Sequence, residues 1–178
     1  MSNYKRSALN VANHWLGRLG LHLAHTSELS LEAALRRVAR KSVPVSTVID
    51  IGASDGRWTA RVLPFYPQAH YCLMDANPVH ETALQTFTAM RPNTHYVMMA
   101  AGDHVGEVYF DTSDHLGGVA QNHPVPGWKR VPVTTLDALV EEKHLAAPFL
   151  IKLDTHGHEV PILEGARIEE THLVQRPS

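Results

Sequence analysis

The stretch VIDIGASDGRW, residues 48–58, decides the fold. It belongs to an apolar run that starts at residue 46 and is rich in β-branched residues without polar alternation, as in a strand buried on both faces. Two glycines, Gly52 and Gly56, follow four positions apart, and a helical pattern runs from Asp55 to about Leu63. A strand that passes through a glycine turn into a helix predicts the first unit of a parallel α/β sheet.

The same pattern repeats along the chain. The stretches HYCLMDAN at 70–77 and THYVMMAAG at 94–102 predict a second and a third strand. Between them, 78–90 predicts a helix with Pro78 near its first turn, where proline is tolerated. The order strand, helix, strand, helix, strand predicts a parallel sheet with right-handed crossovers.

After residue 102 the spacing changes, which predicts an antiparallel detour before the sheet resumes. The expected elements are the strands 106–110 and 129–136, the polar loop 111–127 between them, a helix over 134–145 capped by Thr134 or Thr135, a buried strand at 148–154 and a helix from Pro161. The loop is long for a connection. Its glycines Gly117 and Gly118 are compatible with a hinged substrate lid or with a surface loop without a role.

We expect two parts, a helical N-terminal extension at 1–45 and the main domain at 46–178. In the extension, Ser30 is a candidate N-cap of a helix that packs on the main domain. After the last predicted helix only THLVQ resembles a strand, so we expect the C-terminal strands of the sheet to be missing. The strand at about 149–154 would then lie at an exposed edge, which favours dimerisation or aggregation and weak or absent catalysis.

Composition narrows the class of protein. Hydrophobic residues make up 44% of 178, enough for one sizeable core, and the net charge of −2 gives no footprint for nucleic acid. No run of about 18 apolar residues and no targeting segment is present, so we expect a cytoplasmic protein without membrane contact. The single cysteine, Cys72, is interpreted as a buried hydrophobe.

The glycine turn and its acids indicate the ligand. Ligands of open parallel sheets bind outside the carboxyl ends of the strands, where Gly52 lies, and Asp75 at the end of the second strand can bind both hydroxyls of a ribose. The spacing is G-x-x-x-G rather than the G-x-G-x-x-G of dinucleotide folds, which disfavours a nicotinamide oxidoreductase. Asp50 and Asp55 would repel a pyrophosphate but suit an ammonium and a sulfonium, as in S-adenosylmethionine. The alternative is a structural turn in which Asp55 caps the helix.

A second motif, LIKLDTHGHEVPILEGA, spans residues 150–166. Lys152 lies in a buried strand and needs a partner, and Asp154 points to the same face. Asp154 is therefore either half of a structural ion pair or a functional carboxylate at the mouth of the sheet. A metal site made by Asp154, His156, His158 and Glu159 is disfavoured, because these residues are crowded on one turn and no second cluster completes a site. We expect no metal.

The two motifs, with VTTLDAL between them, resemble the FkbM family of S-adenosylmethionine-dependent methyltransferases. The resemblance implies a Rossmann-like, mostly parallel sheet and methyl transfer, usually to oxygen on a sugar, polyketide or related metabolite. It implies that the cofactor's methionine end is held by Asp50, Gly52, Ala53, Ser54, Asp55 and Gly56, its ribose by Asp75 with Ala76 beside it, and its adenine by Ala101 and Gly102.

The resemblance places Asp154 on the reaction side. A hydroxyl acceptor benefits from a base, and Asp154 and His156 are both candidates, which the sequence does not rank. The expected partner is a small-molecule or glycan acceptor, together with a second copy of the chain if the sheet edge is exposed. The alternative function is a catalytically inactive module, truncated or degenerate, that only binds the cofactor.

Overall fold

The computed structural model describes residues 14, 16, 30–113 and 118–166. The chain divides into two units, residues 1–43 and 44–178. In the first unit, helix α2 spans Leu31–Arg40, and the Ser30 side chain accepts a hydrogen bond from the Ala33 amide, as an N-cap does. The predicted N-cap is therefore confirmed, while packing of this helix on the main domain stays a prediction.

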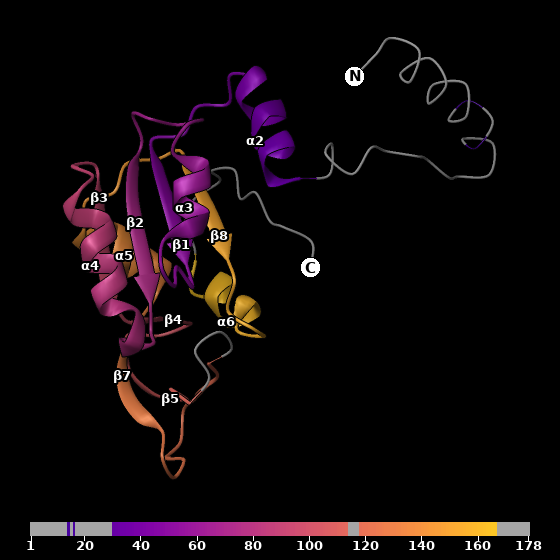
Figure 1. The fold of residues 1–178 in the computed structure, drawn as a ribbon. Helices are drawn as coiled ribbons and strands as arrows, with labels where there is room; N and C mark the ends of the chain where they lie inside the picture. Colours follow the sequence, from indigo (N-terminus) through magenta and orange to yellow (C-terminus); the bar gives the residue numbers. More distant parts are fainter. Residues whose placement is uncertain (1–13, 15, 17–29, 114–117, 167–178) are drawn as a thin grey trace. The chain divides into compact units, whose positions relative to one another are not determined.

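The second unit is built on a four-stranded parallel sheet (Figure 1). Its strands are β1 (Thr47–Ile51), β2 (His70–Asp75), β3 (Thr94–Met98) and β8 (Phe149–Leu153). Their order is β3-β2-β1-β8, and every pair is parallel. The chain thus extends the sheet to one side of β1 and returns on the other side. The strand order therefore reverses between β1 and β8, and such a switch point favours ligand binding.

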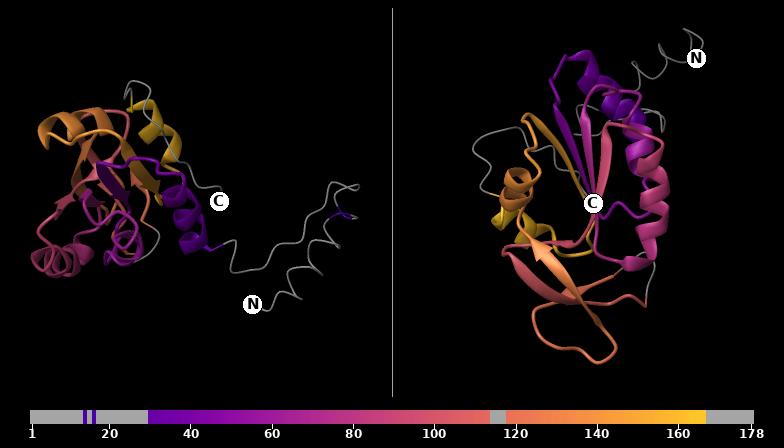
Figure 2. Two further views of the ribbon diagram at one scale, coloured as in Figure 1. Left: turned by 90° about the horizontal axis from the view of Figure 1, so that it is seen from above. Right: turned by 90° about the vertical axis from the view of Figure 1, so that its left-hand side faces the viewer.

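Helices cover both faces of this sheet. They are α3 (Arg57–Val62), the 3-10 helix η3 (Pro78–His80), α4 (Glu81–Ala89), α5 (Leu136–Glu142) and α6 (Glu159–Glu164). Figure 2 shows α3 and α4 on one side and α5 and α6 on the other. Helix α5 begins at Thr135, whose side chain accepts a hydrogen bond from the Ala138 amide at 3.1 Å. The predicted α/β fold and the predicted cap are confirmed.

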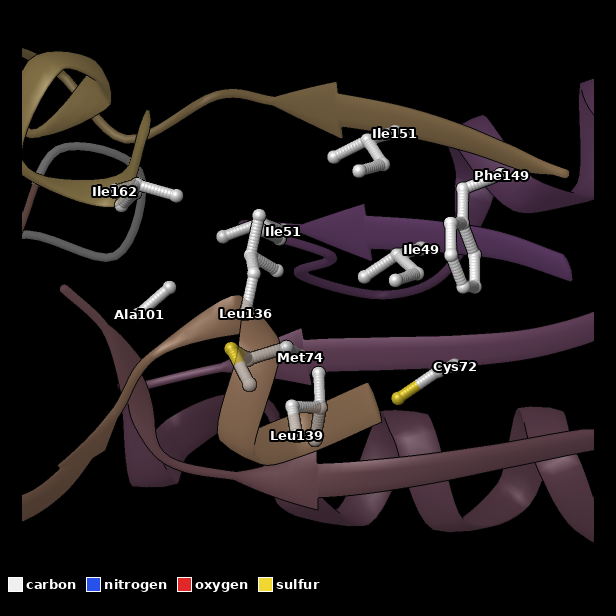
Figure 3. Close-up of a cluster of buried hydrophobic side chains, with 10 residues drawn as sticks. All are labelled: Ile49, Ile51, Cys72, Met74, Ala101, Leu136, Leu139, Phe149, Ile151 and Ile162. Carbon is white, nitrogen blue, oxygen red and sulfur yellow. The ribbon is translucent and has the colours of Figure 1, made fainter. Parts of the chain in front are cut away.

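A hydrophobic core lies between the sheet and α5 and α6 (Figure 3). It comprises Ile49, Ile51, Cys72, Met74, Ala101, Leu136, Leu139, Phe149, Ile151 and Ile162. Alternate residues of β1 face this core, so the intervening Val48 and Asp50 point toward the face covered by α3. Cys72 is fully buried, as expected, and burial raises the pKa of its thiol to about 12.

A second, smaller sheet adjoins the carboxyl ends of the parallel strands (Figure 1). Its order is β4-β7-β5-β6, with β4 at Ala100–Ala101, β5 at Gly106–Phe110, β6 at Ala120–Gln121 and β7 at Lys129–Thr134. The antiparallel pairing of β5 with β7 confirms the predicted detour. The third predicted strand, 94–102, is corrected, because the chain bends at Met99 and Ala100–Ala101 pair with β7 instead.

The described residues of the loop, 111–113 and 118–127, include a short strand that the sequence did not predict. This strand is β6, which pairs with β5, and a Cβ at Gly118 would run into the Phe110 ring. Glycine at 118 therefore permits close packing against Phe110, and the choice between a hinged lid and a loop without a role stays open. Gly117 lies outside the described residues.

Strand β8 is an edge strand within the described part of the chain, where it pairs only with β1. Its Phe149, Leu150 and Ile151 are nevertheless buried. The segment THLVQ lies outside the described residues, so the missing strands and the association through this edge stay predictions. In the described ranges, no helix combines the length and apolar character that crossing a membrane requires.

Candidate functional site

A cavity of about 370 Å³ opens at the carboxyl ends of β1, β2 and β8. Its volume lies in the range of small-molecule pockets. The main sheet and its loops contribute Ile51, Gly52, Ala53, Ser54, Arg57, Trp58, Arg61, Met74, Asp75, Ala76, Asn77, His80, Lys152, Asp154, Thr155, His156 and His158. The second sheet and the approach to it contribute Met99, Ala100, Ala101, Phe110, Gly118 and Ala120. The cavity therefore has walls from both sheets.

The glycine turn follows β1 and forms part of this cavity. Gly52 has a φ of +72°, and its amide and that of Ala53 both donate to the Met74 carbonyl of β2 at 3.0 Å. A Cβ at Gly52 would run into the Asp154 carbonyl at the end of β8. Glycine here is thus required by the close approach of two backbone segments, a reason that the sequence did not reveal.

A buried ion pair lies next to the glycine turn and is hydrogen-bonded to it. Lys152 Nζ lies 3.0 Å from Asp50 Oδ1 and donates to the Gly52 carbonyl at 2.7 Å. The register places Lys152 of β8 directly beside Asp50 of β1, and the Thr59 hydroxyl donates to Asp50 Oδ2 at 2.7 Å. Burial raises the pKa of the Asp50 carboxyl, while Lys152 and Thr59 act against that rise. Asp50 does not line the cavity.

Two other predicted cofactor residues also lie away from the cavity. The N-cap of α3 is Gly56, in the left-handed region at φ +80°, rather than Asp55. Asp55 instead pairs with Arg57 at 2.7 Å, and its hydrogen bonds from Arg57 lower the pKa of its carboxyl. A Cβ at Gly56 would lie 2.8 Å from the Phe87 ring. Neither Asp55 nor Gly56 lines the cavity. The structural alternative for Asp55 is supported in part, because its Oδ1 accepts a hydrogen bond from the Arg57 amide at the start of α3 at 3.1 Å, although the N-cap position belongs to Gly56.

Asp75 ends β2 and does line the cavity. Only 7% of the residue is exposed. The Ser54 amide donates to its Oδ2 at 2.7 Å, and the Asn77 amide donates to its Oδ1 at 2.8 Å. His80 of η3 brings its Nδ1 to 3.1 Å from the same Oδ1. The carboxylate is therefore held rigidly where a ligand hydroxyl can reach it.

One end of the cavity is apolar. Ala76 follows β2, Ala100 belongs to β4, and Phe110 and Ala120 come from the antiparallel strands of the second sheet. These side chains pack on the small core of that sheet. Of the two residues predicted to flank an adenine, Ala101 lines this cavity, whereas Gly102 lines a smaller neighbouring one.

The turn after β8 brings Asp154, His156 and His158 to the cavity. The Asp154 side chain is 61% exposed, with Oδ2 3.4 Å from Lys152 Nζ. Glu159 shapes the turn, because its carboxylate accepts hydrogen bonds from the Thr155 and Gly157 amides at 3.3 and 3.0 Å. Burial acts to raise the pKa of Glu159, but these backbone donors outweigh it and lower the pKa.

No metal site forms in the part of the chain that the structure describes. No group of three or more histidine, cysteine, aspartate or glutamate side chains there is arranged to hold an ion. Glu159 in particular is occupied by backbone amides of its own turn.

Sequence reasoning missed several residues that line the cavity. Three of them follow the ends of predicted strands, namely Trp58, Asn77 and His80. The sequence could have indicated them, because residues just after parallel strands share the edge of the sheet where ligands bind. Phe110 and Ala120 gave no such signal. They reach the cavity only because the second sheet lies across the ends of the first.

The comparisons with known proteins place the chain in a family. Residues 50–176 match the methyltransferase FkbM domain, which is more than half of the chain. The chain belongs to this family, as its two motifs suggested. No curated protein shows significant sequence similarity to it.

Among solved structures, a methyltransferase FkbM from Methylobacillus flagellatus KT is 20% identical, with a TM-score of 0.49. The match covers 72% of this chain and 32% of that one. An O-methyltransferase family protein from Burkholderia thailandensis is 18% identical over 51% of this chain and 25% of that chain, with a TM-score of 0.31. The chain thus spans about a third of the length of the first structure and a quarter of the second.

Proposed function

We propose that this chain binds S-adenosylmethionine in the cavity and transfers its methyl group to a hydroxyl of a small molecule or glycan. The observation that carries the proposal is the pairing of the Gly52 turn with the rigid Asp75 carboxylate in one cavity at the switch point of the sheet. Membership of the FkbM family supports the cofactor and the reaction. A sugar, polyketide or related metabolite is the proposed acceptor.

The residues present fit this cofactor. Asp75 offers a carboxylate for the ribose, and the apolar end formed by Ala76, Ala101 and Phe110 suits a flat purine. Ala53 and Ser54 line the cavity beside the turn, where the methionine end would lie. Asp50 and Gly56, which do not line the cavity, would act indirectly by holding the turn in shape. Asp55 and Gly102 are proposed at most as neighbours of the site.

The main task of the protein in this reaction is to position the acceptor against the cofactor. S-adenosylmethionine supplies a methyl group that its sulfonium already activates, so transfer needs an in-line acceptor and exclusion of water. Asp154 and His156 line the cavity, and they are the groups proposed to take the acceptor's proton. Lys152 is held by Asp50 and the Gly52 carbonyl, and its role is to fix the floor of the site.

Calorimetry and a transfer assay test the proposal together. Titration with S-adenosylmethionine should show binding that Asp75→Asn weakens, since the amide presents a donor where the carboxylate accepts. Incubation with hydroxylated sugars and polyketides should then release S-adenosylhomocysteine. Binding without release for any acceptor would favour the inactive binding module. A chain that does not bind the cofactor would contradict both functions.

A further inference from the structure

The two carboxylate oxygens of Asp75 differ in how open they are to a ligand. A carboxylate oxygen accepts about two hydrogen bonds in its plane. Oδ1 already accepts the Asn77 amide and faces His80 Nδ1 at 3.1 Å, while Oδ2 accepts only the Ser54 amide. Oδ2 therefore has an open acceptor position, whereas His80 Nδ1 lies close to Oδ1. A ribose has two adjacent hydroxyls, and a side chain beside Asp75 can bind the second of them.

His80 is the polar side chain placed to bind this second hydroxyl. It lines the cavity, and its side chain is 16% exposed. Its buried Nδ1, although close to Asp75, has no aligned hydrogen-bond partner among the described residues. Its Nε2 makes a long contact of 3.5 Å with Ser54 Oγ. Both ring nitrogens are thus weakly engaged, so the imidazole can bind a ligand without breaking a strong interaction.

The neighbouring carboxylate sets the tautomer. An imidazole nitrogen that faces a carboxylate carries the proton, which leaves the other nitrogen as an acceptor. With Nδ1 protonated toward Asp75, Nε2 of His80 can accept a hydrogen bond from a hydroxyl in the cavity. The first hydroxyl would donate to Asp75 Oδ2, and the second would donate to His80 Nε2.

We propose that Asp75 and His80 divide the two ribose hydroxyls of the cofactor between them, so that His80 is a cofactor-binding residue. This inference rests on the proposed function, because it assumes that the ligand carries a ribose. It requires that each side chain contributes to binding through one hydroxyl. A merely structural histidine would instead affect both hydroxyls equally or neither.

The test combines variants with altered ligands. Affinities of the wild type and His80→Ala are measured by calorimetry for S-adenosylhomocysteine and its 2′-deoxy and 3′-deoxy analogues. His80→Ala should bind the parent ligand about tenfold more weakly, as expected for one lost hydrogen bond. In that variant, one deoxy analogue should bind as tightly as the parent, while the other should still lose about tenfold. His70→Ala, at the opposite end of β2, is the control and should match the wild type.

The possible failures are distinguishable. If the wild type does not bind S-adenosylhomocysteine, the proposed function fails and the inference fails with it. If the wild type binds and both hydroxyls keep their full contribution in His80→Ala, only the inference is overturned. Should His80→Ala not fold, ring-nitrogen spectra of the wild type decide the question. The Nε2 signal of His80 should move with the parent ligand and stay in place with one deoxy analogue; equal shifts with all three ligands would overturn the inference.

Discussion

At Gly52, glycine is needed by the protein's own backbone before any ligand arrives. Its positive φ and the nearness of the Asp154 carbonyl both exclude a side chain. A substitution at Gly52 damages the fold as well as the site. A Gly52 variant that no longer binds the cofactor would therefore not prove that the cofactor lies beside Gly52. Gly127 offers a matched comparison, because its φ is +86° but a Cβ would meet nothing within 4 Å.

We therefore expect Gly127→Ala to lower the free energy of unfolding by only about 1–2 kcal/mol, the cost of a left-handed alanine. Gly52→Ala should lower it by more than about 3 kcal/mol, because backbone atoms must also move. Denaturant unfolding of the two variants measures the difference. Equal losses would show that the end of β8 yields easily and that Gly52 is not constrained by it.

Asp154 is the residue where the proposed chemistry can be separated from structure. Its side chain is largely exposed, and Lys152 has closer partners in Asp50 and the Gly52 carbonyl. Asp154→Asn should therefore leave the melting temperature nearly unchanged. If Asp154 is the base, the variant should lower kcat about 10²- to 10⁴-fold with little change in cofactor affinity.

His156→Gln is the companion variant for this measurement. A large loss of kcat in His156→Gln with a near-normal Asp154→Asn would assign the proton transfer to the histidine. A melting temperature that falls sharply in Asp154→Asn would instead favour the structural ion pair with Lys152.

At the scale of elements, β1 and β8 are joined by a charged pair, Asp50 and Lys152, near the carboxyl ends of both strands. Removing one member leaves the other buried without compensation, which typically costs about 3–5 kcal/mol. Lys152→Met should therefore destabilise the protein strongly, whereas Asp50→Leu combined with Lys152→Met should recover much of the loss. Chemical denaturation of the single and double variants gives the coupling energy. Additive losses would mean that the pair does not connect the two strands.

The elements also show what the sequence could and could not predict. Apolar runs and helical periodicity predicted the four parallel strands and the α5 cap, because these features depend on local burial and capping. The division of 94–102 into β3 and β4 was missed, since an apolar run does not show where a strand changes partners. Asp50 was predicted to hold the cofactor, but its ion pair with Lys152 was not predicted, because only the register of β1 with β8 brings the two side chains together.

For the whole molecule, acid is expected to weaken folding through His95 of β3. Burial lowers the pKa of this histidine, and its Nε2 has no hydrogen-bond partner among the described residues. The unfolded chain then binds a proton near pH 6.5 that the folded chain resists, so stability falls as the pH drops through that value. Below the lowered pKa of the folded state the loss levels off.

Thermal melting between about pH 7.5 and 5.5 checks this prediction. The uncharged variant His95→Leu should show a smaller decrease in melting temperature over this range than the wild type. Light scattering of the same samples reports whether the chain associates, as an exposed edge at β8 predicts. Identical pH profiles for the two proteins would exclude His95 as the source of acid sensitivity.

The shared construction of the cavity has an evolutionary consequence. Its floor comes from strands β1, β2 and β8, while part of its wall comes from Phe110 and Ala120, which belong to a sheet encoded by a separate stretch of the chain. Mutations in residues 106–134 can therefore change the shape of the cavity without disturbing the Lys152–Asp50 ion pair. Such an arrangement lets proteins that descend from one ancestor diverge in the ligands they bind while they keep the same parallel sheet and ion pair.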